Sequence, residues 1–300
     1  MVERHAAMRA SGGASNNQAR ETQDWQVAGF HRVVGPPNPI HREANGKRLR
    51  GMPGLVSSED RLPCRPFFLF GEPVKARDLF SLPDSLALFE PFFDADAEPW
   101  AWLSRIGEAL AARIQPNAPN GYPAGVHIEG PVYIHPSARL PHTATLIGPI
   151  WIGPGTKLMP GCFLRGNVIV GANCVVGHCA EIKNALLMDD VHAPHRPYIG
   201  DSILGNCSHL GAGVVLSNLR LDQKPITVRL PDGRAINTGL RKFGALLGEK
   251  AEVGCNAVLN PGTILGRRAL VAPSITLGGV VPDATIAHAH TSVRLVPRRD

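Results

Sequence analysis

An aliphatic residue or a methionine occupies every sixth position over one long stretch of this 300-residue chain. The ten positions are Ile134, Leu140, Leu146, Ile152, Leu158, Leu164, Val170, Val176, Ile182 and Met188. A period of six fits neither one helix face nor one simple strand, so it indicates a repeat whose unit is six residues long. Because each such unit can bury its apolar side only against its neighbours, the repeat determines the fold.

The same spacing returns after an interruption. Its anchors are Leu247, Val253, Leu259, Leu265, Val271 and Leu277. The residue two positions before each anchor is usually small. Glycine often follows the anchor directly, as at Gly171, Gly177 and Gly248. We expect short parallel strands joined by tight turns in which these glycines supply the positive φ. The predicted fold class is an all-β solenoid, a parallel β-helix with one continuous apolar column.

The chain divides into three predicted parts. Residues 1–60 lack a periodic apolar face and are expected to form a disordered or extended tail. Residues 61–116 carry apolar residues at helical spacing, from Trp100 to Ile114, and predict a small helical cap over the end of the column. Residues 117–300 form the β-helix, with an insertion at about 217–246 that leaves the six-residue spacing.

Composition narrows the possible functions. The net charge is +6, but the cations are dispersed and aromatic residues make up only 6% of the chain, so no nucleic-acid surface is expected. No stretch is long and apolar enough to span a membrane or serve as a signal peptide, which predicts a cytoplasmic protein. Of the six cysteines, Cys162 and Cys174 fall in the small inward register and are expected to pack as apolar side chains.

The interruption is the expected place for chemistry. The spacing slips at Pro194, and the insertion that follows is strongly cationic, although a solvated hairpin with a turn at 231–233 would explain its distal half equally well. Its cations are Arg220, Lys224, Arg229, Arg234, Arg241 and Lys242. A cationic loop on a solenoid suits an anionic small substrate.

One segment resembles a known family. Residues 193–218 read APHRPYIGDSILGNCSHLGAGVVLSN, and the match extends through 164–185 and 241–266. The segment resembles the acetyltransferase domain of bifunctional N-acetylglucosamine-1-phosphate uridylyltransferase/glucosamine-1-phosphate acetyltransferase, in a short form that lacks the nucleotidyltransferase domain. The resemblance implies a left-handed β-helix with about 18 residues per coil. It also implies acetyl transfer from acetyl-CoA to an amino-sugar phosphate, in sugar-nucleotide and cell-envelope precursor synthesis.

The resemblance also implies roles for individual residues. His195 would be the general base, because an imidazole that titrates near neutral pH can accept the proton of the attacking amine. Backbone amides near Gly211 and Gly213 are expected to stabilise the oxyanion. The positions expected to bind the sugar phosphate are Arg165, Lys183, Tyr198, His209 and Lys242, where His209 replaces the asparagine usual in the family. The positions expected to contact acetyl-CoA are Ala212, Asn218, Cys255 and Pro273.

Two other functions remain open. A binding or assembly protein could keep the sugar-phosphate site without turnover. A gamma-type carbonic anhydrase would bind a metal between subunits through three histidines, such as His178, His192 and His195, but the spacing of His192 and His195 departs from the pair that those enzymes carry. The preferred interpretation is an N-acetyltransferase that needs no metal, forms a homotrimer as its relatives do, and has active sites in clefts between subunits.

Overall fold

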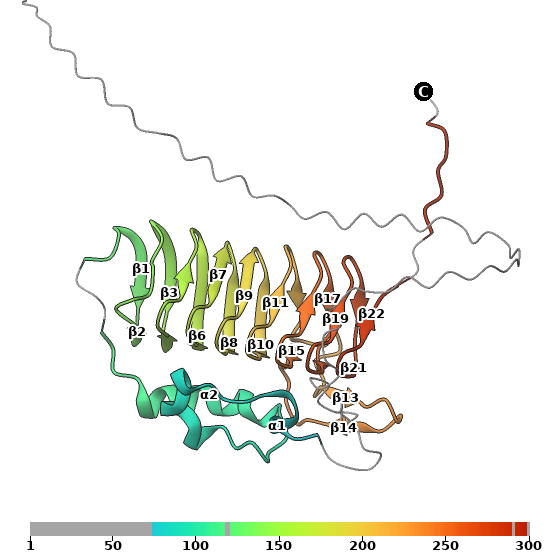
Figure 1. Cartoon of the computed structure of the whole chain (residues 1–300), viewed down its shortest axis with the longest axis horizontal. Helices are drawn as coiled ribbons and strands as arrows, with labels where there is room; N and C mark the ends of the chain where they lie inside the picture. The colour runs from blue at the N-terminus through green and yellow to red at the C-terminus, as the bar shows by residue number, and fades with distance from the viewer. Residues whose placement is uncertain (1–73, 118–120, 290–291, 299–300) are drawn as a thin grey trace, which may run out of the picture. The chain divides into compact units, whose positions relative to one another are not determined.

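The computed structural model describes residues 74–117, 121–289 and 292–298. Within residues 125–287, short parallel strands stack coil on coil (Figure 1). The structure therefore confirms the predicted all-β solenoid of the parallel β-helix type. The predicted tail, residues 1–60, and the first part of the predicted cap lie outside the described residues.

The strands form three lengthwise faces; two are named after outward-pointing tyrosine and histidine side chains, and the third is named for the helices that cover it. The tyrosine face contains β1 (Gly125–Glu129), β3 (Thr143–Ile147), the first halves of β6 (Cys162–Val170), β8 (Glu181–Leu187) and β10 (Tyr198–Leu204), then β12 (Val215–Leu216), β17 (Val258–Leu259) and β20 (Thr276–Leu277). The covered face contains β2 (Val132–Ile134), β4 (Ile150–Ile152), the second halves of β6, β8 and β10, then β15 (Ala245–Leu247), β18 (Thr263–Leu265) and β21 (Val280–Val281). The histidine face contains β5 (Lys157–Leu158), β7 (Val175–His178), β9 (His192–His195), β11 (His209–Leu210), β16 (Glu252–Val253), β19 (Leu270–Val271) and β22 (Ile286–Ala287).

The inward side chains form the predicted apolar column, which includes nearly all of the six-residue anchors. Cys162 and Cys174 lie in it, and burial raises the pKa of both thiols to about 12, so they pack as apolar groups. The prediction fails at Met188, because Leu187 enters the column and Met188 turns outward into a second core. The cause is a register shift between Arg165 and Val168 in β6, which moves the slip upstream of Pro194.

The glycines that follow the anchors have a different role from the predicted one. Positive φ occurs two residues later instead, for example at Asn173 (56°) and Lys250 (58°). Gly171 and Gly248 are needed because of close packing: a Cβ on Gly248 would lie 2.8 Å from the backbone nitrogen of Arg267 in the next coil. These glycines therefore permit close stacking of coils, and the corner residues after them turn the chain.

The helical segment does not cap the column end as predicted. It contains α1 (Ala76–Leu79), the 3₁₀ helix η1 (Asp84–Phe92) and α2 (Ala101–Arg113), and α2 contacts β6, β8 and β10 along the covered face. The physical reason is a row of outward apolar side chains on that face, which need cover. The row consists of Trp151, Ile169, Leu186, Ile203, Leu246 and Ile264. No helix among the described residues is long and apolar enough to cross a membrane.

The insertion contributes to the same second core. It forms an antiparallel hairpin of β13 (Thr227–Arg229) and β14 (Ala235–Asn237), with a turn where the sequence indicated one. Ile226, Val228 and Leu230 are buried with Phe243, whereas the cations of the insertion stay on the outside. The hairpin is therefore anchored by an apolar side, which the solvated-hairpin interpretation did not include.

Candidate functional site

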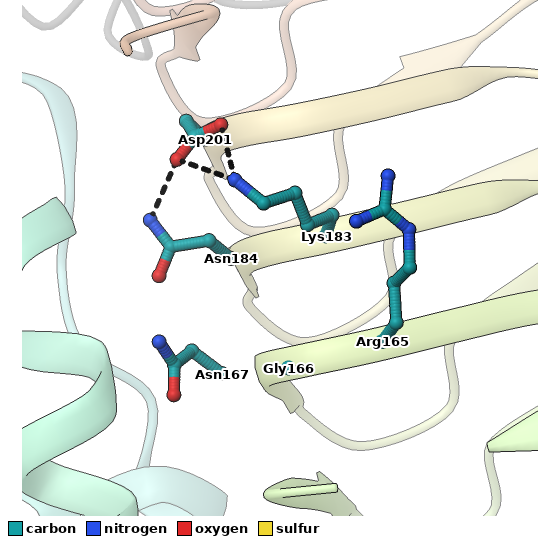
Figure 2. A pocket seen from close by; sticks show the side chains of 6 residues that line it. All are labelled: Arg165, Gly166, Asn167, Lys183, Asn184 and Asp201. Carbon is teal, nitrogen blue, oxygen red and sulfur yellow. Dashed lines mark hydrogen bonds and ion pairs between the residues drawn. The ribbon is translucent and has the colours of Figure 1, made fainter. Parts of the chain in front are cut away.

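A pocket of about 330 Å³ lies where the tyrosine face meets the covered face (Figure 2). It is lined by Arg165, Gly166, Asn167, Lys183, Asn184 and Asp201. These residues come from β6, β8 and β10 and from the corners within them, and the three strands are neighbours in the sheet. Parallel pairing puts Arg165 of β6 directly beside Lys183 of β8. The structure thus brings together two of the cations expected to bind a phosphate.

Both cations have carboxylate partners. Nη2 of Arg165 lies 2.7 Å from Oε1 of Glu181, and about a third of each side chain is exposed. Nζ of Lys183 lies 3.1 Å from Oδ2 of Asp201, whose side chain is only 6% exposed. Each cation keeps further N–H donors beyond these contacts, so it can also bind an anionic ligand.

Asp201 belongs to a row of corner residues that occupy the same place in successive coils. Asn167, Asn184 and Asp201 all have positive φ, between 46° and 54°. Asn and Asp adopt this left-handed conformation more readily than other residues with a Cβ, which explains their presence at the corner. Asn218 continues the row, and its side-chain amide donates to Oδ2 of Asp201 at 2.5 Å.

Tyr198 lies at the start of β10 and is linked to the pocket through Asn218. Its hydroxyl donates to Oδ1 of Asn218 at 3.5 Å. Burial raises the pKa of the Tyr198 hydroxyl, and the negative charges of Glu181 and Asp201 raise it further. Tyr198 is therefore a neutral donor near the charged groups of the pocket.

His195 lies at the opposite edge of the tyrosine face, outside the pocket lining. It ends β9, is exposed, and pairs in register with His178 on β7. The backbone N–H of Gly213 donates to the carbonyl oxygen of His195 at 2.9 Å. This bond places the residues around Ala212 directly above His195 in the next coil.

The predicted acetyl-CoA positions continue that corner. The amide of Asn256 donates to the carbonyl of Ala212, and the amide of Ser274 donates to the carbonyl of Cys255, each at 2.8 Å. A Cβ on Gly254 would in turn contact Pro273 at 2.5 Å. Ala212, Cys255 and Pro273 therefore form one column with His195, whereas Asn218 lies at the pocket edge.

Two of the residues predicted to bind the sugar phosphate, His209 and Lys242, lie outside both the pocket lining and the column that contains His195. His209 is half-buried on the histidine face, between His192 and Glu252 in register. Burial lowers its pKa, and the charges of His192 and His195 act in the same direction against Glu252. Lys242 is exposed beside Phe243, whose amide donates to the carbonyl of Asn218 at 3.0 Å. The backbone of Lys242 thus runs next to the pocket edge.

The amides of Gly211 and Gly213, at the predicted oxyanion position, already have hydrogen-bond partners. The amide of Gly211 donates to the carbonyl of Val253 at 2.7 Å, and the amide of Gly213 donates to His195. Both bonds belong to the stacking of adjacent coils, so neither group is free to receive an oxyanion. These two amides are therefore not the oxyanion donors, and an oxyanion site formed by amides near them stays a prediction.

Sequence reasoning missed four residues around the pocket: Asn167, Asn184, Glu181 and Asp201. A signal was present, because Asn167, Asn184, Asp201 and Asn218 follow one another at steps of 17 residues.

Among the residues that the structure describes, no group of three or more His, Cys, Asp or Glu side chains converges as a metal site would require. His178, His192 and His195 accordingly do not form such a group within the described chain.

Comparison with known proteins adds the family. Residues 146–276 match the model of the GMPPB C-terminal domain. The uncharacterized acetyltransferase YaiX of Escherichia coli O6:K15:H31 (strain 536 / UPEC) is 31% identical over 55% of this chain and 71% of its own length. A bifunctional sugar-1-phosphate nucleotidylyltransferase/acetyltransferase of Sulfurisphaera tokodaii is 29% identical, over 61% of this chain and 44% of that protein.

A third relative is matched over a shorter segment of this chain. The bifunctional protein GlmU of Methanococcus vannielii is 31% identical over 37% of this chain, which corresponds to 27% of that protein. The match with YaiX covers 71% of that relative, whereas the bifunctional proteins are matched over less than half of their length. Together with the six-residue repeat and the solenoid, the match with YaiX shows that the chain belongs to the hexapeptide-repeat acetyltransferases.

Proposed function

We propose that this acyltransferase moves an acetyl group from acetyl-CoA to the amine of an amino-sugar phosphate, such as glucosamine-1-phosphate. The observation that carries the proposal is the pairing of Arg165 and Lys183 in one pocket. The bifunctional relative whose name includes a sugar-1-phosphate supports the same substrate class.

The pocket chemistry suits both parts of such a substrate. The guanidinium of Arg165 uses Nε and Nη2 for Glu181, which leaves other N–H groups available to bind a phosphate. Asn167 and Asn184 offer amide donors and acceptors to the hydroxyl groups of a sugar ring. The carboxylates of Glu181 and Asp201 balance the charges of the two cations, so an anionic ligand would be bound through the N–H donors that these pairs leave over.

His195 would accept a proton from the sugar amine as the amine attacks acetyl-CoA. The amine nitrogen forms a bond to the thioester carbonyl carbon while its proton passes to the imidazole of His195. The carbon–sulfur bond then breaks, and coenzyme A leaves as a thiolate that takes the proton. The column of Ala212, Cys255 and Pro273 beside His195 supports an acetyl-CoA site along that corner.

We also propose a homotrimer, and the separation of His195 from the pocket supports it. His195 and the pocket lie at opposite edges of the tyrosine face, and the pocket lining does not include His195. A second copy of the chain would bring one subunit's His195 corner near a neighbour's pocket, in a cleft that a single solenoid does not form.

Thiol release from acetyl-CoA tests this function. With glucosamine-1-phosphate we expect turnover by the wild type and a loss of about 10²–10⁴-fold in His195→Ala, because general-base catalysis contributes about that much. His127→Ala is a matched control, since His127 is an exposed histidine on β1. No thiol release by the wild type with several amino-sugar phosphates, despite measurable binding of them, would identify a binding protein without turnover instead.

A further inference from the structure

A buried carboxylate, Asp201, lines the pocket and contacts two of its other polar side chains. Asp201 is 4% exposed and accepts hydrogen bonds from Nζ of Lys183 at 3.1 Å, Nδ2 of Asn184 at 3.0 Å and Nδ2 of Asn218 at 2.5 Å. Figure 2 shows two of these partners, Lys183 and Asn184, with their nitrogens directed at the carboxylate. The donors come from β8 and from the chain after β12, so Asp201 joins separate coils.

The backbone conformation alone does not require a carboxylate here. Asn167 and Asn184 occupy the equivalent corner in the preceding coils with nearly the same positive φ. An asparagine at position 201 would therefore satisfy the turn. Burying a charge is unfavourable unless it is paired and hydrogen-bonded, so the carboxylate must be explained by its partners. The one cationic partner among them is Lys183.

The contacts of Asp201 extend to the other residues expected at the site. Asn218, held by Oδ2 of Asp201, accepts the hydrogen bond of the Tyr198 hydroxyl. The carbonyl of Asp201 also accepts from the amide of Gly244 at 2.7 Å, where the insertion returns to the solenoid. One residue thus links Lys183, Tyr198 and the end of the segment that carries Lys242.

We propose that Asp201 is a positioning residue: its carboxylate directs the ammonium of Lys183 into the pocket and holds Asn218 in place for Tyr198. Asp201 does not itself need to touch the substrate, because its oxygens are taken by these three donors. The identity of the ligand that Lys183 receives rests on the proposed function. The control of Lys183 by Asp201 is a property of the protein alone, and it can be measured separately.

The test compares Asp201→Asn with Asp283→Asn. The control carboxylate is half-buried, accepts the amide of Arg267 at 2.7 Å, and belongs to the last coils of the solenoid. Reductive methylation followed by mass spectrometry gives the rate at Lys183, with the exposed Lys157 as an internal reference. We expect Asp201→Asn to raise the relative rate at Lys183 at least about threefold, since the ammonium loses its charged partner. An unchanged relative rate would overturn the proposal.

A measurement on the wild type covers the case in which Asp201→Asn does not fold. Lys183 should then be methylated at least about threefold more slowly than Lys157, because its ammonium is held by a charge-assisted hydrogen bond. Equal rates at the two lysines would contradict the assignment.

Kinetics then separate positioning from simple structural support. Asp201→Asn should raise KM for glucosamine-1-phosphate about tenfold, the scale of a hydrogen bond to a charged group, and leave KM for acetyl-CoA within about twofold. Asp283→Asn should change neither. Equal rises in both KM values would show a general structural effect and overturn the proposal. If the wild type transfers no acetyl group, the proposed function fails, whereas the methylation rates still decide the role of Asp201.

Discussion

The covered face and the tyrosine face are built from the same strands, yet they carry opposite side chains. Along β6, β8 and β10, the second halves present Ile169, Leu186 and Ile203, all fully buried against the helices. The first halves present Arg165, Lys183 and Tyr198, all partly exposed. One turn of the chain at the corner therefore separates a surface that stabilises the fold from a surface that holds polar chemistry.

The energetic contrast has a physical basis. Burying a large aliphatic side chain stabilises a protein by roughly 1.5–3 kcal/mol. A partly exposed ion pair such as Arg165–Glu181 contributes about 0–1 kcal/mol. Changes on the covered face should therefore alter stability, and changes on the tyrosine face should alter ligand binding. A change at Lys183 is expected to alter both stability and ligand binding, because its partner Asp201 is buried.

Leu186→Ala should have the largest effect on stability. Its side chain is fully buried between the solenoid and the helices, so truncation removes apolar contacts and leaves a cavity. We expect the free energy of unfolding to fall by about 3 kcal/mol, within the usual range for such changes, as measured by urea denaturation. KM for the sugar phosphate should not change in the folded fraction. A fall in stability below about 1 kcal/mol would show that the helices do not depend on this face.

Lys183→Met should affect both stability and ligand binding. The variant leaves Asp201 without its cation, which should reduce the free energy of unfolding by about 2 kcal/mol, less than for a fully buried pair because Lys183 is 22% exposed. Binding of the sugar phosphate, measured by calorimetry, should weaken about tenfold to a hundredfold through loss of a charged donor. Unchanged stability with weakened binding would show that Asn184 and Asn218 suffice to stabilise the carboxylate.

Arg165→Lys should change binding alone. The lysine keeps the charge but loses the planar set of donors that reaches Glu181 and a phosphate together. We expect KM for the sugar phosphate to rise about tenfold and the unfolding midpoint to stay nearly constant. A large loss of stability here would contradict the division between the faces.

Val258→Thr should have the smallest effect. Val258 points outward on the tyrosine face and is half-buried, in the same position of its coil as Tyr198. A surface substitution of similar size should change the free energy of unfolding by no more than about 0.5 kcal/mol. A change as large as that for Leu186→Ala would contradict the division between the two faces.

The six-residue spacing predicted the inward column because inward positions repeat with every coil. It did not identify the covered face, although a signal existed: Val168–Ile169–Val170, Ala185–Leu186–Leu187 and Ala245–Leu246–Leu247 are apolar at three consecutive positions. Because alternate strand residues point to opposite sides, such triplets indicate a strand buried on both faces.

The candidate site was predicted in part. The resemblance named Arg165 and Lys183, and the structure brings them into one pocket. Asp201 was missed because its importance depends on contacts from Lys183 and Asn218, which lie in neighbouring coils. The hydrogen bonds that occupy the amides of Gly211 and Gly213 were not foreseen either, because their acceptors also come from adjacent coils. Spacing gives the stack of coils, but not which polar groups each coil already satisfies.

A crystal structure of the protein with coenzyme A and glucosamine-1-phosphate tests the central claim most directly. We predict the phosphate between Arg165 and Lys183, and coenzyme A along the column of Ala212, Cys255 and Pro273. The sugar amine should lie within about 3.2 Å of a His195 imidazole from the same or a neighbouring subunit, as a general base requires. Ligands bound elsewhere, or an amine remote from every His195, would contradict the account.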